Sequence, residues 1–183
     1  TEPASLMPKK CSVRIIRYET KEEDPERDHL GPIESVEGSL YAVIHKTVER
    51  VTALMSSINV WTTDGPKAMA YPPETLWEIV VNAIIHRDYS MSDDVQVLIF
   101  DNRIEVLSPG RLPAFVTKEN ILDVRYARNP RIVGMLSRYK TPPNKDIGEG
   151  LNTAFQKMKE WRLRSPEIID EGNYVRVVIP HTP

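Results

Sequence analysis

The chain has 183 residues, which is enough for one medium-sized domain or a domain with an appendage. Hydrophobic residues make up 40% and charged residues 27%, so a chain that is disordered throughout is excluded. The net charge of -2 argues against non-specific nucleic-acid binding, which needs an excess of basic residues. Cys11 is the single cysteine, which excludes an intramolecular disulfide and a cysteine-rich zinc site.

The sequence carries no sign of membrane insertion or secretion. No apolar run approaches the roughly 18 residues that span a bilayer, and the chain opens on Thr1-Glu2-Pro3 without a charged and then apolar leader. We therefore expect a cytoplasmic protein with no membrane partner. Because there is no initiator Met, we also expect the chain to be part of a longer protein.

The first third is predicted to contain one strand and one long helix. Ser12 to Tyr18 has strand composition, and Glu19 to Asp28 is so strongly charged that we expect a solvent loop. Apolar residues recur at helical spacing from Ser39 to Ile58, where Ser39 can cap the start. The stretch from Trp61 to Pro73 is predicted to be a connector with a turn at its Asp-Gly-Pro sequence.

The remainder is predicted to alternate helices with strand pairs. Pro73 suits the first turn of a helix that continues to about Arg87. Val95 to Phe100 and Arg103 to Leu107 form a predicted hairpin. The other expected elements are helices at 117–122, 129–139 and 151–163, a loop at 140–150, and strands at 167–170 and 174–179.

Two hairpins accompanied by several helices predict an α/β (α+β) two-layer sandwich, with a mixed, mostly antiparallel sheet covered by helices. The regular strand–helix–strand alternation of a doubly wound fold is absent, and so is a Walker-type phosphate loop.

One helix carries the most informative polar pattern. Glu78, Asn82 and His86 are each four residues apart, so they share one face of the predicted helix. An amide oxygen is a hard neutral ligand that suits Mg²⁺, and a carboxylate can orient or deprotonate a water. From periodicity alone, an amphipathic helix with a solvated side is the more frequent explanation. His86, Arg87 and Asp88 are predicted to end this helix rather than to act as a kinase-type catalytic loop.

Two glycine-containing turns are weaker signals. Gly148-Glu149-Gly150 precedes a predicted helix, with Lys145 close by, and glycines let backbone N–H groups approach an anion. Ser108-Pro109-Gly110 indicates a turn after a strand. A basic cluster can face phosphates or form a solvated surface, and the sequence leaves both open; its members are Arg125, Arg128, Arg131, Arg138, Lys140 and Lys145.

The order of these features resembles the GHKL (Bergerat) ATP-binding fold: a Glu-x-x-x-Asn-Ala helix, a glycine turn after a strand, then a Gly-rich loop before a helix. The chain is more closely similar to the RecG-like, GHKL-like domain at the C-terminus of Schlafen-AlbA-type transcriptional regulators. The segments that carry the resemblance are YPPETLWEIVVNAIIHRDYS, EVLSPGRLP, RNPRIVGML and DIGEGLNTAFQKMKEW.

The resemblance implies a role for each matching residue. Asn82 would be the magnesium ligand, Glu78 would activate a water, and Gly110 would lie at the adenine pocket. Gly148 and Gly150 would lie at the phosphates, in a lid loop that contains Lys145. ATP and Mg²⁺ would be the ligands, and a weak Mg²⁺-dependent ATPase would be the activity.

The resemblance also implies a domain organisation. Residues 38–183 would form the GHKL-like domain, and residues 1–37 would be a strand and acidic loop that follow a missing Schlafen-AlbA-type domain. DNA would be contacted through that upstream domain. A homodimer is a separate expectation that the resemblance does not supply.

One departure leaves a second function open. The GHKL adenine box reads Asp-x-Gly-x-Gly, whereas this chain has Ser108, Gly110 and Leu112 at those positions. A serine hydroxyl can still accept a hydrogen bond, but it carries no charge. The alternative is a degenerate module that serves dimerisation or effector sensing without nucleotide, with the helix at 39–58 as its contact surface.

Overall fold

Eight strands and four helices make up the part of the chain that the structure describes. The strands are β1 (Ser12–Tyr18), β2 (Leu30–Glu37), β3 (Asn59–Thr62), β4 (Gly65–Ala68), β5 (Val95–Ile99), β6 (Arg103–Pro109), β7 (Glu167–Asp170) and β8 (Tyr174–Pro180). The helices are α2 (Leu40–Met55), α3 (Pro73–His86), α4 (Pro130–Leu136) and α5 (Gly150–Glu160). This computed structural model describes residues 11–23, 25, 29–62, 65–117, 120–124, 126–144 and 150–181.

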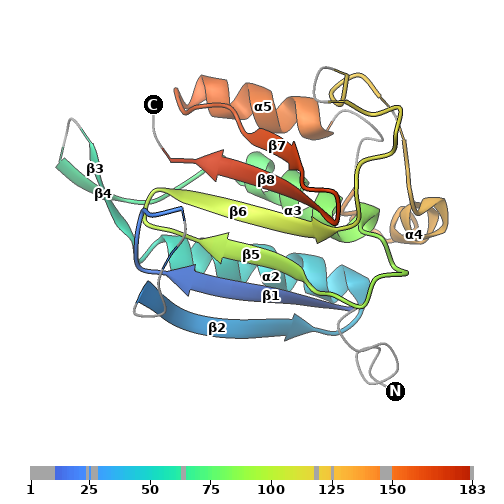
Figure 1. Cartoon of the computed structure of the whole chain (residues 1–183), viewed down its shortest axis with the longest axis horizontal. Helices are drawn as coiled ribbons and strands as arrows, with labels where there is room; N and C mark the ends of the chain where they lie inside the picture. Colours follow the sequence, from blue (N-terminus) through green and yellow to red (C-terminus); the bar gives the residue numbers. More distant parts are fainter. Residues whose placement is uncertain are drawn as a thin grey trace.

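Six strands form one sheet in the order β2-β1-β5-β6-β8-β7, and α2 and α3 lie across one of its faces (Figure 1). β1 and β5 run parallel, whereas every other neighbouring pair in this sheet is antiparallel. The predicted two-layer α+β sandwich with a mixed, mostly antiparallel sheet is therefore confirmed. It is the architecture expected of a GHKL-like fold.

The core lies between the sheet and these two helices. Val95, Val97 and Ile99 alternate along β5 and are all buried, as the period of two in a strand requires. Val43 and Ile44 of α2 belong to the same buried cluster, together with most of α3. Each fully buried aliphatic side chain contributes roughly 1.5–3 kcal/mol. This packing fixes α3 against the sheet, and α3 carries the polar stripe.

The opposite face of the sheet carries charge. Glu105 is buried between two guanidinium groups, accepting from Arg103 Nε at 2.6 Å and from Arg176 Nη1 at 3.1 Å. Arg103 also donates to the backbone carbonyls of Lys21 and Glu22, at 2.9 and 3.0 Å. The acidic stretch therefore has exposed side chains at Lys21 and Glu22, as predicted, but its backbone is anchored to the sheet.

Three expectations about local structure are corrected. The stretch predicted as a connector contains the hairpin of β3 and β4, which projects from the body in Figure 1. β2 was not predicted, because its sequence contains Gly31-Pro32 and alternates with polar residues at the sheet edge. At 117–122 the described residues form turns rather than a helix, with Ile121 N–H donating to Thr117 O at 2.9 Å.

Within the described residues, no helix has the length and apolar character needed to cross a membrane.

Candidate functional site

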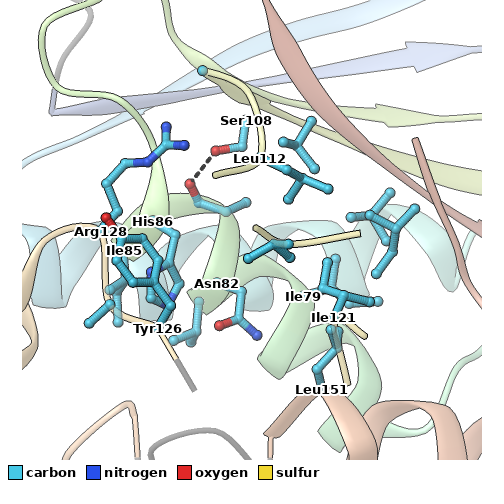
Figure 2. Close-up of a pocket in the computed structure, with 18 of the residues that line it drawn as sticks. Ile79, Asn82, Ile85, His86, Ser108, Leu112, Ile121, Tyr126, Arg128 and Leu151 are labelled. Carbon is cyan, nitrogen blue, oxygen red and sulfur yellow. Dashed lines mark hydrogen bonds between the residues drawn. The ribbon is translucent and has the colours of Figure 1, made fainter. Parts of the chain in front are cut away.

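A cavity of about 230 Å³ opens between α3, the end of β6 and the start of α5. Most of its lining is aliphatic, and the polar groups come from a few positions. Figure 2 places His86, Arg128 and Tyr126 toward one side and Ile79, Ile121 and Leu151 toward the other, with Asn82 between them. Five residues singled out from the sequence line this single cavity: Glu78, Asn82, Ser108, Gly110 and Gly150. Two others, Lys145 and Gly148, lie outside the described residues.

The polar stripe of α3 faces the cavity. Glu78, Asn82 and His86 all line it, because residues four apart share one side of a helix. The Asn82 amide makes no hydrogen bond to the described residues and is not sealed from solvent, so its oxygen and nitrogen are open to a ligand. The polar stripe therefore lines a pocket, although its periodicity would also fit a helix face exposed to solvent.

Ser108 lies at the end of β6 and is 8% exposed. Its hydroxyl donates to the carbonyl oxygen of Ala83 at 2.7 Å, shown as the dashed line in Figure 2. A hydroxyl has one proton, so the lone pairs of Ser108 are the part left for a ligand. At this point the cavity wall is a neutral hydrogen-bond acceptor.

The backbone conformation at position 110 requires glycine. Its φ of +107° is a conformation that L side chains rarely adopt. A Cβ here would lie 2.7 Å from the Cβ of Asp88 and would collide with the guanidinium of Arg128. The turn is held further by Gly110 N–H, which donates to Asn173 O at 2.8 Å. Only glycine fits this turn without strain.

At position 150, glycine is required by a neighbouring side chain rather than by the backbone conformation. It is the first residue of α5, it is buried, and a Cβ there would collide with the carboxylate of Glu78. The helix start and the carboxylate therefore pack directly against each other. The absence of a side chain at position 150 is what leaves room for Glu78 in the cavity wall.

Two neighbouring residues, which sequence reasoning placed elsewhere, shape the same end of the cavity as Ser108. Arg128 lines the cavity and donates to the carbonyl of Arg111. Asn129 directly precedes α4, but its side chain makes no capping bond there. Its Nδ2 instead donates to Ile85 O and Arg87 O, at 2.8 and 2.9 Å, and so closes the last turn of α3.

The basic cluster is divided by the structure. Arg128 lines the cavity, whereas the side chains of Arg131, Arg138 and Lys140 are exposed and do not line it. Arg125 and Lys145 lie outside the described residues.

His86, which was predicted both to belong to the polar stripe and to end the helix, faces the cavity. Burial lowers the pKa of its imidazole, and the nearby Arg128 charge lowers it further. Both effects favour the neutral ring. The signal for His86 was present in the sequence as the third member of the stripe that contains Glu78 and Asn82.

Asn144 also lines the cavity, and nothing in the sequence pointed to it. Its Oδ1 is buried and has no hydrogen-bond partner among the residues that the structure describes. The segment is anchored one residue earlier, where Trp77 Nε1 donates to Pro143 O at 2.8 Å. Buried acceptors in proteins normally have a partner, so this oxygen is a candidate contact for a ligand in the cavity.

The described residues contain no cluster of three or more His, Cys, Asp or Glu side chains that could hold a metal ion. A metal in this cavity would therefore need most of its ligands from a bound molecule and from water.

Among known proteins, one family matches part of this sequence, and a solved structure has a similar fold. Residues 92–179 match the family described as "Putative ATP-dependent DNA helicase recG C-terminal". The Glu78–His86 stripe precedes that stretch. No curated protein matches the chain.

Among solved structures, the chain is similar to the crystal structure of the DIP2311 protein from Corynebacterium diphtheriae. The TM-score is 0.72 at 20% sequence identity, over 95% of this chain and 35% of that protein. At this identity the similarity supports the fold alone, and the chain spans about a third of that protein. Residues 92–179 are therefore similar to a RecG C-terminal-like domain of the ATPase type, and the sheet order and the similar solved structure are consistent with a GHKL-like fold.

Proposed function

We propose that the cavity binds ATP together with magnesium. The observation that carries this proposal is the convergence of Glu78, Asn82, Ser108, Gly110 and Gly150 on one cavity from three separate elements. The family match, which describes an ATPase-type domain, supports the same ligand. A volume of about 230 Å³ is below the roughly 300 Å³ at which pockets for drug-sized molecules begin. We therefore assign the interior to the base and the opening to the phosphates.

The base end fits adenine without an aspartate. Since the Ser108 hydroxyl donates to Ala83 O, Ser108 can only accept from the ligand, and the exocyclic amino group of adenine is a donor. Hydrogen bonds to charged groups are roughly twice as strong as neutral ones, so a serine holds adenine less tightly than the carboxylate of the usual box. Leu112, which lines the cavity, adds apolar contact to a flat ring.

The phosphate end fits a hydrated magnesium ion. Asn82 offers an open amide oxygen, and the partnerless Oδ1 of Asn144 can accept from a coordinated water. Magnesium takes oxygen ligands and keeps several waters, so one protein amide plus phosphate oxygens is a sufficient set. Bound magnesium would neutralise phosphate charge.

Hydrolysis would rest on Glu78. Its carboxylate packs against the start of α5, which holds it in the cavity wall beside Asn82. From there it can accept a proton from a water that attacks the terminal phosphate. Slow hydrolysis of this kind would act as a conformational switch within a DNA-binding, homodimeric transcriptional regulator whose DNA contacts lie in an upstream domain.

The test is calorimetric titration of the 183-residue chain with ATP, with and without Mg²⁺. We expect Mg²⁺-dependent binding that Asn82→Ala weakens by about tenfold to a hundredfold, which corresponds to the roughly 1.5–3 kcal/mol of a bond to a charged group. Asn59→Ala is the matched control, because Asn59 is an exposed amide on the projecting hairpin. If millimolar ATP gives neither heat nor a thermal shift, the ATP proposal is wrong, and the degenerate module for dimerisation or effector sensing takes its place.

A further inference from the structure

We propose that His86 is a base-contacting residue, which donates a hydrogen bond to a ring nitrogen of an aminopurine while Ser108 accepts from the neighbouring amino group. This inference rests on the proposed nucleotide binding. It names the edge of the base that the cavity recognises and the residue that recognises it.

The first step is that His86 is available to a ligand. It faces the cavity, and among the described residues none hydrogen-bonds to either of its ring nitrogens. Neither nitrogen belongs to the buried atoms that lack a partner, so both remain reachable. The other polar groups at this end of α3 already have partners. Arg87 donates to Met91 O and Asp93 O, and Asn129 donates to the carbonyls that end the helix.

The second step is that His86 and Ser108 both lie at the last turn of α3. A helical carbonyl points along the axis toward the residue four positions later. Because Ser108 donates to the carbonyl of Ala83, its hydroxyl lies against the last turn of α3, the turn that carries His86. Both side chains line the cavity; in Figure 2 Ser108 lies at the top of the view and His86 on the left, beside Tyr126.

The third step is the hydrogen-bonding character of the pair. The neighbouring Arg128 charge and burial both favour the neutral imidazole, which has one N–H donor and one acceptor nitrogen. Ser108 supplies an acceptor. The complementary edge therefore presents a donor beside an acceptor, as the amino group of adenine does beside ring nitrogens N1 and N7. Guanine and hypoxanthine carry a carbonyl at the amino position, which would face the Ser108 lone pairs.

The experiment compares ATP with 7-deaza-ATP, 1-deaza-ATP and ITP on the wild-type chain and on His86→Phe. We expect one deaza analogue to bind the wild-type chain about threefold to tenfold more weakly than ATP, the size of one neutral hydrogen bond. With His86→Phe, ATP and that analogue should bind equally. ITP should bind more weakly than ATP to both proteins, because Ser108 is unchanged.

Two controls separate recognition from folding. His86 makes no hydrogen bond within the described part of the chain, so the unfolding midpoint of ligand-free His86→Phe should not fall, whereas a structural role would lower it. His45→Phe is the matched variant: His45 packs between Tyr41 and Trp77 and does not line the cavity, and it should discriminate among the analogues as the wild-type chain does.

The deaza series alone can overturn the proposal, without any variant. If both deaza analogues bind the wild-type chain as tightly as ATP, His86 makes no base contact. If His86→Phe still distinguishes the analogues, another group makes that contact. If the wild-type chain binds no ATP at all, the nucleotide function itself fails together with this inference, and that outcome is distinct from the other two.

Discussion

Gly110 and Gly150 were both expected at the nucleotide site, and both line the same cavity, but they are needed for different reasons. Gly110 has a left-handed backbone and approaches Asp88 closely. Gly150 has an ordinary helical position, and what a side chain there would meet is the end of the flexible Glu78 side chain.

The difference indicates how the two ends of the cavity are built. At the Ser108 end, the turn is determined by backbone geometry and held by Gly110 N–H to Asn173 O and by Asp88 N–H to Pro109 O, at 2.8 and 2.7 Å. At the Glu78 end, a carboxylate can rotate away. We therefore expect substitution of Gly110 to change mainly stability and substitution of Gly150 to change mainly ligand binding.

The largest effect is expected for Gly110→Ala. A strained φ costs of order 1–3 kcal/mol, and overpacking against Asp88 and Arg128 adds a similar amount. The free energy of unfolding should therefore fall by about 2–5 kcal/mol in chemical denaturation. A decrease below about 1 kcal/mol would mean that the turn relaxes easily, and the contrast between the two glycines would be lost.

Gly150→Ala should change stability by less than about 1 kcal/mol, because alanine favours the helix and Glu78 can move aside. The displaced carboxylate should instead lower the affinity for Mg²⁺–ATP by about tenfold, measured by calorimetry. The matched control is Gly134→Ala in α4, where a Cβ would meet no atom within 4 Å. That variant should gain up to about 1 kcal/mol of stability with unchanged affinity. Equal affinities for both variants would mean that displacing the Glu78 carboxylate does not disturb the ligand site, and the contrast between the two ends would be lost.

The sequence predicted well those elements that local chemistry determines. β1, α2, α3 and the β5–β6 hairpin lie where apolar periodicity and capping residues predicted them. The β3–β4 hairpin was missed because Pro66 is a poor strand residue, and a strand pair that projects from the body has little apolar burial to signal it.

The candidate site shows the same division. Glu78 and Asn82 could be found from their spacing, since one helix presents both. Asn129 and Arg128 could not, because their partners are backbone carbonyls on α3 and in the turn after β6, far away in sequence. The spacing of His86 fitted the stripe, but the sequence could not show whether the residue lines a pocket or simply ends the helix. The packing of Ser108 against α3 indicates that it lines a pocket.

The smallest change in stability is expected for Asn144→Ala, at the Glu78 end. Its Oδ1 is buried without a partner among the described residues, so removing it relieves a desolvation cost of about 1–3 kcal/mol that offsets the lost packing. The unfolding midpoint of the ligand-free protein should stay the same or rise, while the additional stabilisation by Mg²⁺–ATP should shrink. Asn120→Ala is the matched control, because its amide accepts from Thr117 N–H at 2.7 Å and donates to Phe115 O at 2.9 Å. Asn120→Ala should lower the free energy of unfolding by about 1 kcal/mol and leave the ligand response intact. If Asn144→Ala destabilises the free protein as much as Asn120→Ala does, then Asn144 supports the fold and its side chain is not a ligand contact.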